Sequence, residues 1–324
     1  MAKYLITGVA GFIGSAIAHA LLERGASFRG IDNLSTGRRQ NIAAIAGKFD
    51  FRQVDLLDRA ALADACKGVD CVFHQAAIPS VPRSVANPLE NNAANVDGTL
   101  NLLVAAREAK VRRVVYAASS SAYGETPTLP KREDMAPDPI SPYAVAKLAG
   151  EMYLKSFYRV YGLETVALRY FNIFGPRQDP NSPYSAVLAR FISSMLAGKA
   201  PTIFGDGETS RDFTYVENAV HANLLAAEAP GEKVAGRVFN VATGSRTSLN
   251  QAFAALKKLT GYTGEPIYAP ARAGDIKHSL ADVTRAREAF GYSVQVNFDE
   301  GLRRTVEWYR SQAAADPAVP ASAR

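Results

Sequence analysis

The chain has 324 residues, of which 48% are apolar and 21% charged, and its formal net charge at pH 7 is +6. This composition is ordinary for a globular protein, so it excludes a disordered or collagen-like chain, and the length allows one large domain or two closely joined ones. The basic residues are scattered, which argues against a nucleic-acid-binding module and favours a small phosphate-bearing molecule as the anionic partner.

Strand and helix patterns alternate through the first half of the chain. Hydrophobic periodicity and turn signals predict strands at 3–7, 28–31, 49–54, 69–74, 114–118 and 165–169. The same signals predict helices at 12–24, 89–109 and 142–161. Strands that alternate with helices indicate α/β architecture, with a parallel sheet covered by helices on both faces.

The pattern loosens after Gly175, where prolines and glycines recur. Strands are predicted at 202–204 and 238–241, and helices at 185–197, 216–229, 249–260, 284–290 and 298–312. We therefore predict a doubly wound domain over residues 1–175, to which some later segments return, and a smaller α/β lobe over 176–312. Residues 313–324 are rich in Ala, Pro and Ser and are expected to form a disordered tail.

A glycine loop, TGVAGFIG, joins the first predicted strand to the first helix. Glycine allows a sharp turn at Gly8, a close approach of backbone to pyrophosphate at Gly11, and tight helix–strand packing at Gly14. The helix that follows presents free N–H groups and the positive end of its dipole to an anion. This strand–loop–helix context predicts a Rossmann-type dinucleotide site.

Carboxylates follow the second and third predicted strands. Asp32 can accept hydrogen bonds from the ribose hydroxyls of adenosine and would repel a 2′-phosphate, which favours NAD over NADP. An Asx turn at Asp32 and Asn33 is the structural alternative. Asp55 is suited to hold the adenine amino group, and the small residues 75–77 suit a backbone that passes close to the cofactor.

Three side chains form a candidate catalytic set. Tyr143 and Lys147 are one helical turn apart on a helix that Ser141 and Pro142 begin. Tyrosine has an ordinary pKa of about 10, and a nearby ammonium group should lower it. Ser119, at the end of the fifth strand, can hydrogen-bond to the same substrate hydroxyl. Beside a dinucleotide, this set predicts removal of a proton from a hydroxyl group.

These motifs together resemble the extended short-chain dehydrogenase/reductase family. The resemblance spans residues 3–308 and rests on TGVAGFIG, NVDGT, SSSAYG, SPYAVAK, RYFNIFGPRQ and GDGETSRDFTYV. Within that family the chain is most similar to UDP-hexose 4-epimerases. The segment RQDPNSPYSAV is most similar to the branch that acts on UDP-N-acetylglucosamine and related sugars.

The resemblance implies a tightly bound, catalytic NAD. Tyr143 would take the proton of the C4 hydroxyl with Ser119 aligning it, and C4 would give its hydride to NAD and recover it on the other face of a 4-keto sugar. The implied cofactor contacts are Gly8, Gly11, Phe12, Ile13, Gly14, Asp32, Asn33, Ser35, Thr36, Gly37, Asp55, Leu56, Gln75, Ala76, Ala77, Asn95, Tyr143, Lys147 and Tyr170.

The resemblance also implies a site for the UDP-sugar. Asn172 would reach the diphosphate, Arg211 and Arg272 would clamp it, and Asp275 would hold the uridine ribose. Ala186, Val187, Thr202, Ile203 and Phe204 would frame the uracil. The remaining implied substrate contacts are Ser80, Ser121 and Ser279.

Two serines distinguish the reaction from those of related enzymes. Sugar 4,6-dehydratases of this family carry two acids where this chain has Ser120 and Ser121, and the decarboxylases carry one, so both reactions are disfavoured.

The resemblance also bears on the choice of sugar. It implies that Ser279 occupies a position that gates the sugar pocket, where a small residue leaves room for a 2-acetamido group. Uronate epimerases tend to carry arginine where this chain has Asp179, which disfavours a simple uronate.

Several alternatives stay open at this point. UDP-N-acetylglucosamine 4-epimerisation is the first, and UDP-glucose 4-epimerisation proper or epimerisation of an N-acetylated uronate are the others. A non-catalytic NAD-binding regulator is disfavoured by the intact catalytic set. A sugar 4-reductase would use NADPH, which Asp32 disfavours.

The predicted helices 89–109 and 142–161 carry apolar residues on more than one face, which exceeds what one buried stripe needs. The resemblance implies that they form a four-helix bundle in a homodimer. Neither the cysteines nor the histidines are spaced like metal ligands, so we predict no metal and two buried free thiols, Cys66 and Cys71. We expect no membrane span and a cytoplasmic location.

Overall fold

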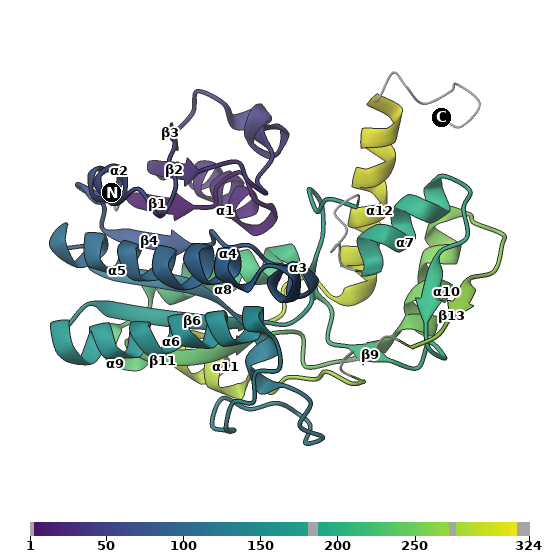
Figure 1. Cartoon of the computed structure of the whole chain (residues 1–324). Coiled ribbons are helices and arrows are strands. Elements are labelled where there is room, and N and C mark those ends of the chain that lie inside the picture. The colour runs from purple at the N-terminus through teal and green to yellow at the C-terminus, as the bar shows by residue number, and fades with distance from the viewer. Residues whose placement is uncertain (1–2, 181–186, 272–276, 316–324) are drawn as a thin grey trace.

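A seven-stranded sheet forms the centre of the molecule in the computed structural model, which describes residues 3–180, 187–271 and 277–315 (Figure 1). The strand order is β11-β6-β5-β4-β1-β2-β3, and every neighbouring pair is parallel. The strands are β1 (Tyr4–Thr7), β2 (Phe28–Asp32), β3 (Asp50–Gln53), β4 (Cys71–His74), β5 (Arg113–Ser119), β6 (Glu164–Tyr170) and β11 (Arg237–Val241). The order reverses between β1 and β4, where such folds place their ligands.

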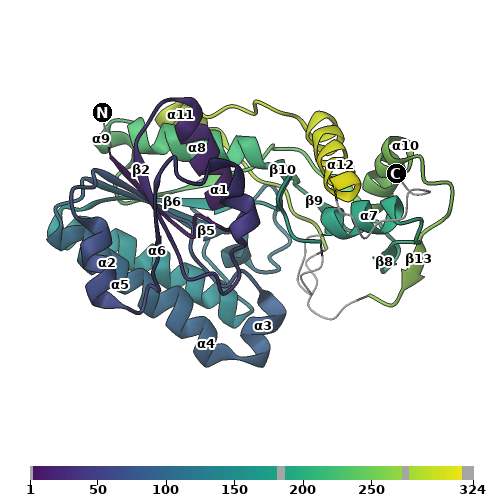
Figure 2. The same ribbon diagram turned by 90° about the horizontal axis from the view of Figure 1, so that it is seen from above.

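Helices cover both faces of this sheet (Figure 2). One face carries α1 (Phe12–Glu23), α8 (Val216–Glu228), α9 (Gly231–Val234) and α11 (Thr284–Phe290). The other carries α2 (Arg59–Cys66), α3 (Val81–Ala86), α4 (Pro88–Asn92), α5 (Gly98–Glu108) and α6 (Pro142–Tyr161). Two apolar clusters, one under each layer, form the core. The predicted doubly wound α/β sheet is confirmed.

The smaller lobe lies to one side of the sheet, where the strands end. It contains α7 (Val187–Leu196), β8 (Thr202–Phe204), α10 (Leu249–Thr260), β13 (Ile267–Ala269) and α12 (Phe298–Ala315). Short strand pairs connect it to the sheet domain: β7 (Ile173–Phe174) with β10 (Thr214–Tyr215), and β9 (Ser210–Arg211) with β12 (Thr247–Ser248). The chain returns to the large sheet through α8 and β11.

The differences from the predicted elements concern short helices and the short strands β7, β9, β10, β12 and β13. The predicted helix 89–109 is α4 and α5 joined by one wider turn at Ala93–Asp97. The helices α2 and α3, and the 3₁₀ turns Arg39–Ile45 and Ser120–Tyr123, were not predicted because a few residues cannot establish a helical period. Helix α12 continues to Ala315, so the expected tail begins later than residue 313, and residues 316–324 lie outside the described part.

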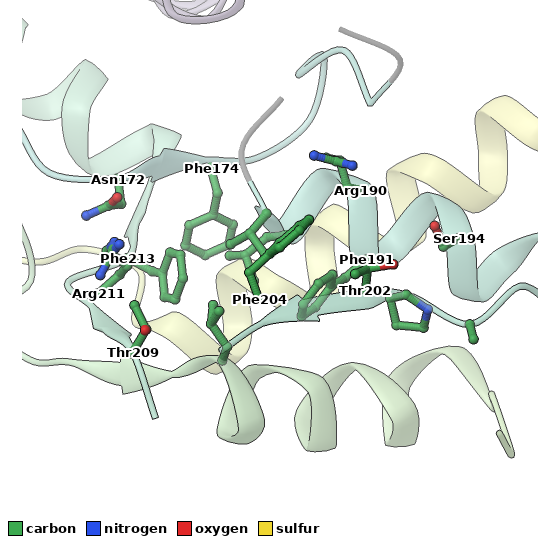
Figure 3. Close-up of a pocket in the computed structure, with 15 residues that line it drawn as sticks. Asn172, Phe174, Arg190, Phe191, Ser194, Thr202, Phe204, Thr209, Arg211 and Phe213 are labelled. Carbon is green, nitrogen blue, oxygen red and sulfur yellow. The ribbon is translucent and has the colours of Figure 1, made fainter. Parts of the chain in front are cut away.

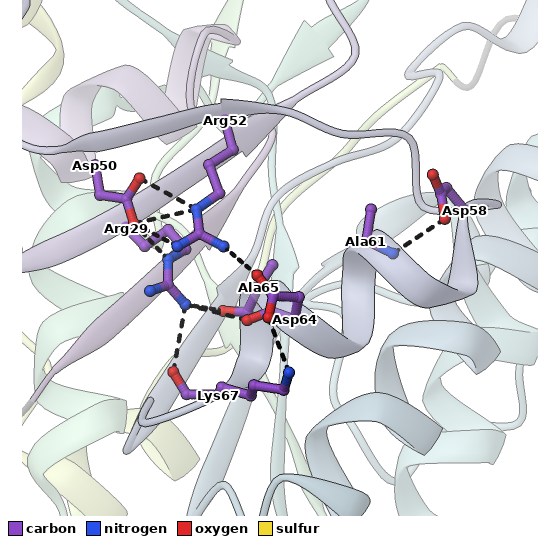
Figure 4. Close-up of polar contacts among 8 residues, drawn as sticks. All are labelled: Arg29, Asp50, Arg52, Asp58, Ala61, Asp64, Ala65 and Lys67. Atoms are coloured by element: carbon purple, nitrogen blue, oxygen red, sulfur yellow. Dashed lines mark hydrogen bonds and ion pairs between the residues drawn. The ribbon is translucent and has the colours of Figure 1, made fainter.

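Charged side chains fasten the outer strand β3 to its neighbours (Figure 4). Arg29 of β2 donates to Asp50 of β3 at 2.7 Å and to the carbonyl of Ala65, near the end of α2, at 2.6 Å. Arg52 reaches from β3 to Asp64 of α2 at 2.8 Å. The Arg29 guanidinium therefore satisfies a carbonyl at the end of α2, and the ion pair of Arg52 with Asp64 helps to fix this helix over the sheet edge.

Cys66 and Cys71 are free and buried, as predicted, and burial raises the pKa of each thiol to about 12. Within residues 3–180, 187–271 and 277–315, no cluster of three or more His, Cys, Asp or Glu side chains could hold a metal ion. The same residues contain no helix with the length and apolar character of a membrane span.

His74 joins two strands and a helix beneath the ligand edge. Its Nδ1 lies 2.8 Å from the Thr7 hydroxyl and its Nε2 3.0 Å from the Thr99 hydroxyl. Thr99 donates its own proton to the carbonyl of Asn95, so it must accept from Nε2–H, and Nδ1 therefore accepts from Thr7. Burial lowers the pKa of His74 to about 3, which keeps the ring neutral.

We predict that His74 makes the protein less stable in mild acid. The unfolded histidine binds a proton below its ordinary pKa of 6.5, whereas the folded one does not. Lowering the pH from 7 to 5 should therefore cost about 2 kcal/mol of unfolding free energy through this residue. Urea unfolding at both pH values measures it, and the variant His74→Gln should lose that part of the pH dependence.

Burial also lowers the pKa values of His19 and His221. Both residues are present in wild type and in His74→Gln, so their effect on the pH dependence of stability is the same in the two proteins. An identical pH dependence in wild type and variant would contradict the assigned protonation state.

Candidate active site

The glycine loop is held by contacts of backbone with backbone. Gly8 has a φ of +70°, and a Cβ there would lie 2.7 Å from the amide nitrogen of Ala76 in the segment after β4. A Cβ at Gly14 would collide with the carbonyl of Gly8. Both glycines are thus required by the packing of β1, α1 and β4, and they bring the loop to the point where the strand order reverses.

Asp32 connects the glycine loop to the loop after β2. One carboxylate oxygen accepts from the amide of Ala10 at 2.9 Å, and the other accepts from the amide of Leu34 at 2.8 Å. The second contact is the Asx turn that the sequence left open as an alternative. Burial raises the pKa of Asp32, and the two hydrogen bonds act against this. Gly37 packs against the carboxylate.

The rest of this loop forms a polar rim with the end of β3. Asn33 donates to Asp55 at 2.7 Å, and its own side-chain oxygen accepts from the amide of Ser35 at 2.9 Å. Ser35 and Thr36 are exposed, whereas Leu56 is buried beneath Asp55. The carboxylates of Asp32 and Asp55 thus stand on two adjacent strand ends.

Polar side chains from distant segments also meet near the ends of β4 and β6. Tyr170 donates to the side-chain oxygen of Gln75 at 3.3 Å and accepts from Asn223 of α8 at 2.6 Å. Asn223 also binds Gln75, at 3.1 Å. Asn95 is occupied with both backbone groups of Ile78, which holds the segment after β4 in place. Asn223 was not predicted, although an asparagine in an apolar helix is a usable signal.

The observed residues fit a dinucleotide. Helix α1 begins at Phe12 and Ile13, directly after Gly11, and no side chain in the described part of the chain caps its first N–H groups. These N–H groups can therefore bind a pyrophosphate. Ala76 and Ala77 expose backbone rather than bulky side chains above β4.

Ser119, Ser121 and Tyr143 meet at the end of β5. The hydroxyl of Ser119 accepts from the hydroxyl of Ser121 at 2.8 Å and from its amide at 3.2 Å. The one proton of Ser119 is therefore available to another acceptor. Burial raises the pKa of Tyr143, and a hydrogen bond with Ser119 lowers it. The structure thus brings the predicted serine and tyrosine together.

Lys147 is buried and faces β5. Its Nζ donates to the carbonyl of Ala117 at 2.8 Å and lies 4.8 Å from the centre of the Tyr116 ring. Burial lowers the pKa of Lys147 to about 7, and Glu151 raises it. The expected lowering of the tyrosine pKa by this lysine is not found in the protein alone. Burial has the largest effect on the pKa of Tyr143, and Lys147 is itself desolvated and donates to a carbonyl.

Three side-chain hydrogen bonds fix the start of α6. Ser141 accepts from the amide of Ala144 at 3.2 Å and Pro142 occupies the first turn, which confirms the predicted helix start. Ser84 accepts from the amide of Tyr143 at 3.0 Å, and Asn91 donates to the carbonyl of Pro142 at 3.1 Å. Ser84 and Asn91 come from α3 and α4, and sequence reasoning did not identify them.

A cavity of about 290 Å³ opens between the sheet edge and the smaller lobe (Figure 3). Its walls are aromatic and aliphatic, with cationic and amide groups at the rim, and they include Asn172, Phe174, Val187, Arg190, Thr202, Phe204, Arg211 and Phe213. Arg190 of α7 was not predicted, and no sequence motif marks it. A cavity with aromatic walls and arginines in its lining suits a nucleotide base that carries phosphates.

The residues predicted to hold the UDP half of the substrate fall into three groups. Asn172, Val187, Thr202, Phe204 and Arg211 line this cavity. Ile203 is fully buried, because alternate side chains of β8 point to opposite faces, so only its backbone can frame a base. Ala186, Arg272 and Asp275 lie outside the described residues.

Ser279 is buried close to Asn172. Its hydroxyl lies 3.5 Å from the side-chain nitrogen of Asn172, and its amide donates to the carbonyl of Ser210 at 3.1 Å. Arg211 is held by the carbonyls of Ser210 and Lys277, at 3.0 and 3.4 Å. Asn172, Arg211 and Ser279 therefore form one neighbourhood between the catalytic end of the sheet and the cavity.

Two further residues have contacts that the sequence did not indicate. The hydroxyl of Ser80 accepts from the amide of Arg83 and so begins α3. Asp179 forms an ion pair of 3.0 Å with Arg38, which belongs to the loop after β2. This ion pair connects the loop after β2 to the segment that precedes α7.

Comparison with known proteins agrees with these features. The model of the NAD dependent epimerase/dehydratase family matches residues 4–242. A UDP-glucose 4-epimerase of Mycolicibacterium smegmatis is 41% identical over 317 residues, which cover 96% of this chain and 99% of that protein.

Two solved structures extend the similarity to the fold. A UDP-glucose 4-epimerase of Thermotoga maritima with UDP-glucose has a TM-score of 0.91 and 40% identity. A UDP-N-acetylglucosamine 4-epimerase of Methanobrevibacter ruminantium M1 in complex with UDP-N-acetylmuramic acid has a TM-score of 0.91 and 43% identity. Each match covers 96% of this chain and 99% of the other. The chain therefore belongs to the NAD dependent epimerase/dehydratase family, as an NAD-dependent UDP-sugar 4-epimerase.

Proposed function

We propose that this protein interconverts UDP-N-acetylglucosamine and UDP-N-acetylgalactosamine at C4, and that it also accepts UDP-glucose. The observation that carries the choice of sugar is Ser279, a small buried side chain 3.5 Å from Asn172 at the border between the catalytic set and the cavity. A serine leaves space that a bulky aromatic residue would fill. The M. ruminantium relative, named for UDP-N-acetylglucosamine, supports this choice.

By this proposal the glycine loop and the loop after β2 would hold NAD, which would supply the acceptor for the C4 hydride. The N–H groups at the start of α1 would bind the pyrophosphate, and Asp32 and Asp55 would bind the adenosine. Because Asp32 already accepts from Ala10 and Leu34, its lone pairs are aligned before the ribose hydroxyls arrive.

Tyr143 is the proposed proton acceptor, and Ser119 is the proposed aligning group. Tyr143 accepts the C4 hydroxyl proton and later gives it back, and Ser119 aligns the hydroxyl because Ser121 occupies its acceptor side. Lys147 supplies positive charge behind the tyrosine. The raised pKa of Tyr143 has to fall for this chemistry, and positive charge brought by the oxidised nicotinamide would lower it.

Asn172, Arg190 and Arg211 are proposed to hold the UDP half. Two carbonyls orient Arg211, and the planar guanidinium suits diphosphate oxygens. The aromatic walls of Phe174, Phe204 and Phe213 suit the uracil ring. UDP-glucose 4-epimerisation proper is the second candidate, since the M. smegmatis and T. maritima relatives carry that name.

Incubation with UDP-N-acetylglucosamine and UDP-glucose in separate reactions, followed by separation of the products, tests the sugar. We expect turnover of both in the wild type. The variant Ser279→Tyr should lose at least about tenfold in kcat/KM for the acetylated sugar, because the ring takes the place of the acetamido group, and should keep UDP-glucose turnover. Ser293→Tyr, on the exposed surface, is the matched control. A wild type that turns over only UDP-glucose would sink the first candidate.

The variant Tyr143→Phe tests the proton acceptor. We expect kcat to fall by about 10²–10⁴-fold, since the ring remains but the phenol oxygen is gone. Calorimetric titration with UDP should give an unchanged affinity, because the cavity is formed by other residues. Near-normal turnover in this variant would remove Tyr143 from the mechanism.

A homodimer through the helical face of α4 and α6 is also proposed. Leu89, Val145 and Met152 are 82%, 52% and 49% exposed, and Val145 and Met152 are two helical turns apart on the same side of α6. Large apolar side chains gathered on neighbouring helices are costly to leave in water, and a second copy of the same face would cover them.

Sedimentation analysis tests this dimer. We expect the wild type to sediment as a dimer and the double variant Leu89→Glu/Met152→Glu as a monomer, because buried charges cannot be paired across the interface. Ile267→Glu is the matched control, since Ile267 is 56% exposed but lies on β13 in the smaller lobe. A monomeric wild type, or a dimer that survives both charges, would contradict the proposal.

A further inference from the structure

A buried ion pair lies one helical turn beyond Lys147 on α6. Arg169 of β6 donates to both carboxylate oxygens of Glu151, from Nε at 2.9 Å and from Nη2 at 2.7 Å. The side chains of Glu151 and Arg169 are 0% and 4% exposed. Replacing a buried pair of this kind with apolar residues is often neutral for stability, so stability alone does not account for it.

The pair connects the segments that carry the catalytic set. Tyr143, Lys147 and Glu151 follow one another at intervals of one turn, so they share the face of α6 that lies on the sheet. Arg169 stands opposite Ala118 in the sheet, next to the pairing of Ser119 with Tyr170. Its guanidinium lies 4.5 Å from the ring centre of Tyr123, in the turn that begins after Ser119.

Helix α6 approaches β5 closely on the same face. A Cβ at Gly150 would collide with the hydroxyl of Tyr116, so glycine is required there. Lys147 is bound to the carbonyl of Ala117 on β5, and Glu151 is bound to Arg169 on β6. Two anchors on adjacent strands prevent the helix from sliding along its axis and from rotating about it.

The network continues from Tyr123 toward the sugar side of the site. The hydroxyl of Tyr123 donates to Asn240 of β11 at 2.6 Å. The amide of Asn240 donates to the carbonyls of Lys131 and Asp282, at 2.9 and 3.0 Å. Asp282 belongs to the segment that carries Ser279. These contacts lead from the turn after Ser119 through β11 to Asp282, which lies close to Ser279 in the chain.

We propose that Glu151 and Arg169 are positioning residues, which hold Tyr143 and Lys147 in reach of Ser119 by fixing α6 on β5 and β6. The proposal rests on the catalytic roles given above to Ser119, Tyr143 and Lys147. Neither member of the pair touches the substrate. A supporting observation is that Glu151 opposes the effect of burial on the pKa of Lys147.

Three variants test the pair. Glu151→Gln leaves Arg169 buried with half its partner, and it should lower both Tm and kcat. Glu151→Gln/Arg169→Met removes both charges and keeps the volume, so its Tm should recover above that of the single variant. Its kcat should stay about tenfold or more below wild type with KM within about threefold, because lost alignment affects the transition state and not ground-state binding.

The third variant, Arg169→Lys, keeps the charge but loses the two-pronged contact. We expect a Tm between those of wild type and Glu151→Gln, and a kcat between those of wild type and the double variant. This variant decides the question if the double variant yields no folded protein. In every case the bound NAD per chain is measured, and it should equal that of the wild type.

The chain offers a matched control at the other end of the same strands. Arg113 and Glu164 pair at 2.6 Å where β5 and β6 begin, and they stand opposite each other in the sheet. Glu164→Gln should lower Tm without changing kcat, because this pair is remote from Ser119.

Recovery of wild-type kcat together with Tm in the double variant would overturn the proposal, and so would a Glu164→Gln variant that loses as much kcat as Glu151→Gln. An active Tyr143→Phe variant would instead overturn the proposed catalytic roles, so the two failures are distinguishable.

Discussion

The close approach of α6 to β5 is the constraint on which the catalytic end of this molecule depends. Gly150 admits the hydroxyl of Tyr116, and Lys147 reaches over that ring to the carbonyl of Ala117. A lysine that is desolvated in this way has a pKa near neutrality, so its charge responds to what binds beside it. The same packing sets how far Tyr143 stands from Ser119, because both residues belong to rigid elements.

The ligand edge is assembled from strand ends that are far apart along the chain. Parallel strands bring their carboxyl ends to one side of the sheet, and each contributes a different part. β1 supplies the glycine loop, β2 supplies Asp32, β5 supplies Ser119 and β6 supplies Tyr170. The buried polar groups beneath this edge bind one another, as His74 does with Thr7 and Thr99, which fixes the edge.

The sheet edge and the cavity beside the smaller lobe have different surfaces, and each suits a different ligand. The sheet edge offers backbone amides, carboxylates and the proton-transfer groups, which suit a cofactor and a reacting hydroxyl. The cavity beside the smaller lobe offers aromatic walls and arginines, which suit a base and a diphosphate. Asn172 and Ser279 contact each other where the two surfaces meet. Hydroxyls at 120 and 121, in place of acids, leave C4 as the reacting centre.

The sequence by itself determined the sheet, the glycine loop and the helix start at Ser141, because each depends on local periodicity or on spacing within one element. The grouping of Ser119 with Tyr143 was predicted from the combination of motifs. Only the tertiary structure decided which side chains from remote segments complete the site. Asn223 reaches Tyr170 and Gln75, Ser84 holds the amide of Tyr143, and Arg169 binds Glu151. It also decided that burial raises the pKa of Tyr143 and lowers that of Lys147. Burial and long-range contacts arise only when the layers pack, so no local pattern in the chain encodes them.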